Sequence, residues 1–255
     1  MASPLTVDVV VPVYNEEEDI PRNIPILRDF LAGPDFSYRW RIVISDNGST
    51  DQTPEVSRAL EGRYPGEVTY FPVSGRGKGR AVKEAWAASN AGIVSFMDVD
   101  LSTALTDFPR LIDAVARDGY DFAIGSRLHP DSRIRRSLKR RVTTRVYNTL
   151  VKRLFGIHFS DAQCGFKAAS TDAAHRLLPL VEDIGWFFDT ELLVIAEKAG
   201  YRIKEIPVTW AEDERTSVTI ISTIAADLRG LARLRRTRPW RSAPRREARA
   251  EAHRT

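Results

Sequence analysis

Residues 93–100 read IVSFMDVD, a largely apolar run that is followed directly by Asp98 and Asp100. A short apolar run bounded by polar residues is typical of a buried β-strand. Side chains alternate along an extended segment, so we expect the two carboxylates to point to the same side. Such a pair could hold Mg²⁺ or Mn²⁺, because both ions prefer oxygen ligands and leave room for substrate phosphates. Paired aspartates also occur as capping acids in solvated loops, and it is the position after a buried strand that favours the metal site.

Short apolar runs of the same kind recur along the first half of the chain. Besides 93–97, we expect strands at 7–11, 41–45, 68–72 and 121–124, separated by helices near 16–31, 54–64, 80–89 and 108–117. This alternation predicts an α/β fold with a mostly parallel sheet and helices on both faces. Ligands of such sheets bind beyond the carboxyl ends of the strands.

Polar clusters follow four of these runs, at 14–16, 46–49, 98–100 and 125–127. Their convergence on one edge of the sheet predicts the ligand site. Asp46 ends an otherwise apolar run, and it could accept hydrogen bonds from a base or a ribose. Residues 75–80, GRGKGR, precede a helix, so Lys78 and the helix start could contact a diphosphate. A flexible basic surface loop explains that segment equally well.

The second half of the chain is strongly basic. Net charge is −7 over residues 1–126 and +11 over 127–255. The excess lies mainly in 127–153 and 228–255, which favours a polyanionic partner such as phosphate groups, an anionic membrane or nucleic acid. A nucleic-acid-binding protein is the weakest of these alternatives, because it leaves Asp98 and Asp100 unexplained.

The remaining elements suggest how the chain is organised. We expect helices near 137–154 and 189–198, a strand near 202–208, and a helix in which Ile220, Ile224, Leu228, Leu231 and Leu234 form one apolar stripe. That stripe could pack on the domain or lie in a membrane interface. We therefore predict a domain over 1–213, an amphipathic helix over 214–237 and a disordered basic tail over 238–255.

Localisation follows from what the sequence lacks. It contains no run of eighteen apolar residues and no recognisable signal peptide, and its one cysteine, Cys164, excludes an internal disulfide. Cys164 is interpreted as a small buried residue. We expect a cytoplasmic protein, peripheral on the cytoplasmic face of the membrane.

Four elements, taken in order, resemble family 2 of the inverting glycosyltransferases, which have the GT-A fold. They are VPVYNE at 11–16, DNGSTD at 46–51, GKG at 77–79 and DVD at 98–100. The resemblance implies that Pro12, Tyr14, Glu16, Asp46, Lys78 and Asp98 bind the nucleotide sugar. It also implies that Asp98 and Asp100 hold the metal. Many members have a second aspartate where this chain has Asn47.

The second half resembles the dolichyl-phosphate and polyprenyl-phosphate sugar synthases, especially the glucosyl branch. The matching pieces are GSR at 125–127, LKRR at 138–141 with Arg145 and Asn148, DAQCGFK at 161–167 and GWFFDTELL at 185–193. The resemblance implies a nucleotide-sugar donor, with UDP-glucose preferred and GDP-mannose next, and a polyprenyl-phosphate acceptor. A homo-oligomer and a separate membrane-protein partner are both left open.

Two kinds of acceptor differ in whether the enzyme must remove a proton from them. A sugar hydroxyl requires a base, for which Asp189 and Glu191 are candidates, and residues two apart on a helix do not share a face. A phosphate monoester is already largely ionised at neutral pH, because its second pKa is about 6. It requires cations instead, which Arg127, Arg140, Arg141 and Arg145 could supply. We therefore count Asp100, Asp189 and Arg127 as the catalytic candidates, and a soluble saccharide remains the alternative acceptor.

Overall fold

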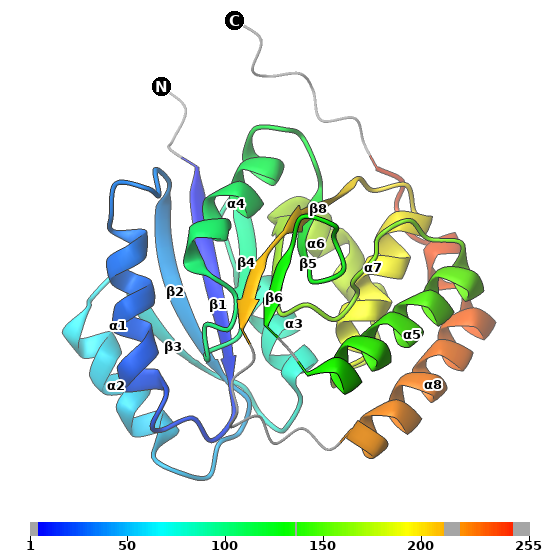
Figure 1. The fold of residues 1–255 in the computed structure, drawn as a ribbon. Coiled ribbons are helices and arrows are strands. Elements are labelled where there is room, and N and C mark those ends of the chain that lie inside the picture. Colours follow the sequence, from blue (N-terminus) through cyan, green and yellow to red (C-terminus); the bar gives the residue numbers. More distant parts are fainter. Residues whose placement is uncertain (1–4, 136, 212–219, 247–255) are drawn as a thin grey trace, which may run out of the picture.

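The computed structural model describes residues 5–135, 137–211 and 220–246 (Figure 1). A seven-stranded sheet in the order β3-β2-β1-β4-β7-β5-β8 forms its centre. Its strands are β1 (Thr6–Val13), β2 (Arg39–Asp46), β3 (Val68–Pro72), β4 (Ile93–Met97), β5 (Phe122–Ser126), β7 (Phe166–Ser170) and β8 (Ile203–Pro207). Only β7 runs antiparallel to its neighbours β4 and β5, so the predicted mostly parallel α/β fold is confirmed.

Helices cover both faces of the sheet. One face carries α1 (Ile20–Leu31), α2 (Thr53–Arg63) and α4 (Phe108–Ala116) with the short turn η1 (Leu105–Asp107) before it. The other carries α3 (Lys78–Ala88), α5 (Leu138–Phe155), α6 (Thr171–Leu177), η2 (Leu178–Leu180), α7 (Phe188–Lys198) and α8 (Ile220–Thr237). Every residue of β4 is buried, which is why its sequence is a continuous apolar run.

A small second sheet closes one side of the domain. It pairs β6 (Arg133–Arg135) with β9 (Thr209–Ala211). The parallel strands run toward the lower edge in Figure 1, where α5 and α8 also begin. The segments that follow the strands therefore share one edge with the basic start of α5.

The C-terminal half of α8 packs on the domain. Leu231 and Leu234 are buried in the core that α7 and α5 share. Gly230 packs against the ring of Phe187 so closely that a Cβ at this position would overlap with it. Leu228 is 51% exposed, and the side chains of 220–224 lie outside the described residues. None of the described helices is long and apolar enough to cross a membrane.

The predicted disorder after residue 237 is wrong for 238–246. A short turn, η3 (Pro239–Arg241), places Trp240 edge-on against Phe155, with ring centroids 6.0 Å apart. Further along, Arg246 forms an ion pair of 2.7 Å with the buried Asp121. One aromatic side chain and one buried carboxylate thus hold a segment that has no apolar stripe of its own. Residues 247–255 lie outside the described residues.

Candidate active site

Asp98 lies at the carboxyl end of β4, against the loop that precedes β7. Its backbone N–H donates to the carbonyl of Gly165 at 3.3 Å, and a Cβ on Gly165 would overlap with the Asp98 carboxylate. The glycine is therefore required for the aspartate to occupy this position. On its other side, Asp98 Oδ1 lies 2.5 Å from the ammonium of Lys78.

Lys78 connects several parts of the site. Its ammonium lies 4.9 Å from the ring of Trp186 and 5.6 Å from that of Phe96. Burial disfavours the charged form, but the charges of Asp98, Asp189 and Asp100 outweigh it and hold the pKa of Lys78 above its usual value. Three predicted carboxylates thus converge on one lysine.

Asp100 shares a small hollow with Asp98. Asp100 Oδ1 accepts a hydrogen bond of 2.9 Å from the backbone N–H of Ser102, and burial together with the charge of Asp98 raises the pKa of the Asp100 carboxyl. The hollow measures about 10 Å³, room for a single water molecule or ion. Its lining consists of Met97, Asp98, Asp100, Leu101, Ser102, Thr103 and Gly165.

Glu16 brings further negative charge to this edge. Burial and the charges of Asp19, Asp100 and Asp51 raise the pKa of the Glu16 carboxyl to about 7. No group of three or more His, Cys, Asp or Glu side chains within the described residues could hold a metal unaided. An excess of carboxylates with two of them beside an ion-sized hollow fits Mg²⁺ or Mn²⁺, which take few protein ligands when a substrate supplies phosphate oxygens.

The loops after β1 and β2 are joined to each other. Asn15, in the left-handed region with φ of 54°, accepts from the backbone N–H of Thr50 at 2.8 Å. Asn47 donates to the carbonyl of Val13 at 2.8 Å and accepts from the N–H of Gly77 at 3.1 Å. The structure therefore brings the segments around 14–16 and 46–51 together, as the convergence of strand ends predicted, and adds the segment 75–80 to them.

Asp46 has both carboxylate oxygens engaged within the protein. Oδ1 accepts from the N–H of Ser49 and Oδ2 from the hydroxyl of Tyr70, each at 2.9 Å, and the residue is buried. Each oxygen retains a second lone pair, so a ligand contact stays a prediction. Pro12 is buried near the end of β1, two residues before Tyr14. The Tyr14 hydroxyl has no partner among the described residues, and the Arg76 guanidinium lies 4.4 Å from its ring centroid.

The start of α3 is not an open anion site. The N–H groups of Gly79 and Arg80 donate to the carbonyls of Gly185 and Ile184 at 3.1 and 3.0 Å. A Cβ on Gly77 or Gly79 would overlap with the 184–188 segment, which explains the two glycines. The predicted contact of the helix start with a diphosphate is thus wrong for these two amides, because a neighbouring loop occupies them. Lys78 reaches the site through its side chain alone.

Arg127 is committed to Asp161. Its Nε and Nη2 lie 2.8 and 3.0 Å from the two carboxylate oxygens of Asp161, in a fork arrangement. Burial would raise the pKa of Asp161, but the charge and hydrogen bonds of Arg127 hold it below its usual value. Arg127 therefore fixes the 161–167 loop to the end of β5, and its charge is already balanced.

The other three arginines lie in the first half of α5. Arg141 and Arg145 are exposed, and Arg140 is half-buried. The helix is fastened to the 161–167 loop because Asn148 Oδ1 accepts from the N–H of Ala162 at 2.9 Å. The basic start of α5 thus lies at the edge that carries the strand ends (Figure 1).

The two candidate bases have different surroundings. Asp189 lies 2.9 Å from the ammonium of Lys167, and both side chains are buried. Glu191 Oε2 accepts from the N–H groups of Glu182 and Asp183 and from Arg233 Nη2 at 2.7 Å. Glu191 therefore holds α8 and the loop before α7. Asp189 instead pairs with Lys167, and its charge also acts on Lys78.

Sequence reasoning missed what the 161–167 segment does. Asp161 holds Arg127, Gly165 makes room for Asp98, and Lys167 neutralises Asp189. Its one thiol is inert, because burial raises the pKa of Cys164 to about 12. The signal was present in DAQCGFK, which family resemblance singled out without a physical role.

An α/β sheet with a carboxylate pair, a lysine and glycine-rich loops at its carboxyl edge has the architecture of a nucleotide-dependent transferase. The chain matches Glycosyl transferase family 2 over residues 8–178 and belongs to that family. The predicted glycosyltransferase with a GT-A fold is thereby confirmed.

Relatives and solved structures agree with this assignment. Glycosyltransferase AglD of Haloferax volcanii is 35% identical over 88% of this chain, which spans 36% of that protein. Dolichyl-phosphate beta-glucosyltransferase of Saccharomyces cerevisiae is 32% identical over 83% of this chain and 69% of its own length. Glucosyl-3-phosphoglycerate synthase from Mycobacterium tuberculosis, solved with Mn2+, uridine-diphosphate and phosphoglyceric acid, shares the fold. It has a TM-score of 0.65 and 21% identity, covering 94% of this chain and 80% of that chain.

Proposed function

We propose that this chain transfers a hexose, glucose from UDP-glucose in the first instance, to a polyprenyl phosphate with inversion at the sugar. The observation that carries the acceptor class is the state of the two candidate bases. Asp189 is paired with Lys167 and Glu191 with Arg233, so each carboxylate is already committed to a cation within the protein. A general base must reach the proton that it removes, and a carboxylate committed in this way is poorly placed to do so. An acceptor that arrives ionised avoids the need for a base.

Donor binding is assigned to the edge where the loops converge. The Asp46 carboxylate, Tyr14 and Pro12 would form the nucleoside side, and Lys78 would hold the Asp98 carboxylate in position. Asp98 and Asp100 would hold the divalent cation, which when bound neutralises charge on the departing diphosphate. Burial is the main cause of the raised pKa of the Glu16 carboxyl, and the charges of Asp19, Asp100 and Asp51 add to it, so a bound cation would be favoured at this edge.

Acceptor binding is assigned to the start of α5. Arg141 and Arg145 are exposed there and can offer bidentate contacts to phosphate oxygens, with Arg140 behind them. Arg127 acts as a positioning residue in this proposal, because its fork is already bonded to Asp161. This revises the direct phosphate contact that the sequence suggested for it.

The same helix offers a surface for a membrane. Val142 and Val146 are 55% and 63% exposed, one turn apart on α5, and alternate with Arg141 and Arg145. Exposed apolar side chains flanked by arginine are typical of surfaces that lie in a membrane interface. We propose peripheral binding to the cytoplasmic face of the membrane through this part of α5. This places the phosphate of a lipid acceptor near the site.

The test compares two lipids that differ only in the phosphate. Single-turnover transfer from labelled UDP-glucose is measured with polyprenyl phosphate and with the corresponding free polyprenol, in the presence of Mn²⁺. We expect product only with the phosphate. Equal rates with polyprenol, or with a soluble saccharide, would show that the acceptor is a hydroxyl. Replacing the donor by GDP-mannose in the same assay distinguishes the glucosyl from the mannosyl activity.

A further inference from the structure

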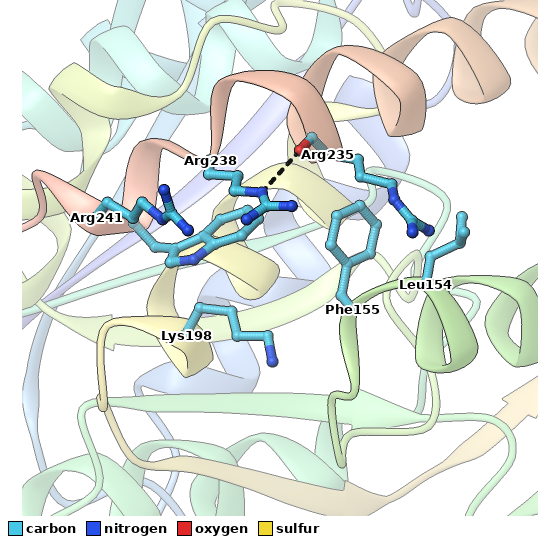
Figure 2. A pocket seen from close by; sticks show the side chains of 7 residues that line it. Leu154, Phe155, Lys198, Arg235, Arg238 and Arg241 are labelled. Atoms are coloured by element: carbon cyan, nitrogen blue, oxygen red, sulfur yellow. Dashed lines mark hydrogen bonds between the residues drawn. The ribbon is translucent and has the colours of Figure 1, made fainter.

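A second hollow lies where α5, α7 and α8 end, away from the strand ends (Figure 2). It measures about 220 Å³, far larger than the hollow beside Asp98. Its walls are formed by Leu154, Phe155, Lys198, Arg235, Arg238, Trp240 and Arg241. Helix α5 starts near the transfer site and ends at this hollow, and its eighteen residues span about 27 Å. The two hollows are therefore separate sites.

Four of the seven lining side chains are cationic, and their charges are not balanced nearby. Within 5–135, 137–211 and 220–246, no carboxylate forms an ion pair with Lys198, Arg235, Arg238 or Arg241. Two of the four donate one hydrogen bond each to a carbonyl. Lys198 Nζ reaches Gly156 O at 3.4 Å, and Arg238 Nε reaches Arg235 O at 3.2 Å (dashed line in Figure 2). Most of their N–H donors remain available.

Helix capping accounts for only part of this charge. Lys198 and Arg235 lie in the last turns of α7 and α8, where cations complement the helix dipole. Each helix end carries about half a negative charge, so three ends offset about 1.5 of the four positive charges. Arg238 and Arg241 come after the end of α8. A net positive charge therefore remains over a hollow with aromatic and aliphatic walls.

The hollow is fixed by the backbone before any ligand binds. Arg238 has φ of 49° and ψ of 54°, the left-handed region that non-glycine residues rarely adopt. This conformation turns the chain back so that Trp240 packs on Phe155. Beyond the turn, the Tyr201 hydroxyl donates to the Pro244 carbonyl at 3.1 Å. Strained residues persist where the surrounding structure holds them, and they are common at binding sites.

We propose that this hollow, lined by Lys198, Arg235, Arg238 and Arg241, is a second binding site for a phosphate-bearing anion. Guanidinium forks match phosphate oxygens bidentately, and four cations around one hollow can contact a single anion together. The anion is either a free phosphate compound or the headgroup of an anionic phospholipid. The site is independent of the transfer reaction proposed above.

The experiment uses the full chain in EDTA, so that any metal-dependent donor site does not contribute. Binding of inorganic pyrophosphate is measured by calorimetry. Binding to vesicles of phosphatidylcholine with and without phosphatidylglycerol is measured by sedimentation. The test variant is Arg235→Gln with Arg241→Gln. The matched control is Arg236→Gln with Arg245→Gln, which removes the same charge from exposed residues that do not line the hollow.

We expect the test variant to bind at least ~10-fold more weakly than the wild type, because it loses two charge-assisted contacts, while the control changes less than ~3-fold. Loss confined to pyrophosphate identifies a free phosphate compound, and loss confined to anionic vesicles identifies a headgroup. Equal loss in both variants, or no binding of either probe by the wild type, overturns the proposal. If circular dichroism shows that the double variant does not fold, Arg241→Gln replaces it, since no described hydrogen bond involves that guanidinium. Wild-type affinity in that variant overturns the proposal too.

Discussion

Substituting Gly165 tests whether the 161–167 segment sets the position of Asp98. A Cβ at residue 165 would lie 2.5 Å from Asp98 Cγ and 2.7 Å from Oδ1, whereas ordinary contacts are 3.4 Å or longer. In Gly165→Ala the carboxylate must therefore move by about 1 Å from the position in which it contacts the ammonium of Lys78. A misplacement of ~1 Å in a reacting constellation costs on the order of 10²-fold in rate. We expect a loss of this size in kcat/KM with UDP-glucose and Mn²⁺.

The measurement pairs transfer kinetics with calorimetric binding of UDP in the presence and absence of Mn²⁺. Gly62→Ala is the control, because this exposed glycine of α2 has nothing within 4 Å of the added Cβ. Alanine should stabilise that helix by about 0.5–1 kcal/mol and leave activity unchanged. If Gly165→Ala bound UDP and Mn²⁺ like the wild type and turned over normally, the proposed role of Asp98 would be refuted.

Three further substitutions test other parts of the molecule. Burial raises the pKa of the Asp227 carboxyl from 3.8 to about 6, so its ionisation destabilises the fold as pH rises through 6. In urea unfolding at pH 8, Asp227→Asn should be more stable than the wild type by roughly 1–3 kcal/mol, and at pH 4 it should be no more stable. The control Asp35→Asn, at an exposed residue, should have wild-type stability at both pH values. Glu191→Gln should lower Tm, because it weakens the contact to Arg233. The folded variant should keep its single-turnover rate within ~3-fold of the wild type. A loss of rate above ~100-fold would identify Glu191 as a base. Arg141→Ala should raise the acceptor KM about ten-fold without changing donor binding. The control Arg153→Ala, at the far end of α5, should change neither quantity. Equal effects of the two variants would show that the acceptor phosphate does not bind at the start of the helix.

The strands that the sequence predicted are short runs rich in β-branched and aromatic residues. Residues 93–97, which are fully buried, and residues 68–72, a partly exposed edge strand, were both predicted with their observed bounds. Strand β7 was missed because its sequence, FKAAS, contains a lysine and small residues. Lys167 can be buried there only because Asp189, twenty-two residues later, lies against it. Such a contact between residues far apart in the sequence forms only in the folded chain, and no periodic sequence pattern predicts it.

The candidate site was likewise predicted only in part. Asp98 and Asp100 were predicted at a strand end and Lys78 at a helix start, and the structure brings them together. The partners of Arg127 and Glu191 were not predicted, because a charged residue in a sequence gives no indication of which opposite charge it will meet. The amides at the start of α3 were thought available to a ligand, and only the fold reveals that residues 184–185 occupy them.

Four cation–carboxylate pairs hold the site together, and they link its stability to its chemistry. They are Lys78–Asp98, Arg127–Asp161, Lys167–Asp189 and Arg233–Glu191. Each member is buried or partly buried, so removing one side chain leaves a charge with little solvent to stabilise it. Arg127 holds the pKa of the Asp161 carboxyl below its usual value, whereas burial raises the pKa of the Glu191 carboxyl despite Arg233. What the four pairs share is that each carboxylate is already committed to a cation within the protein, which suits a site that holds and orients charged groups. The proposed phosphate acceptor, which carries its own negative charge and would meet the exposed arginines at the start of α5, fits such a site.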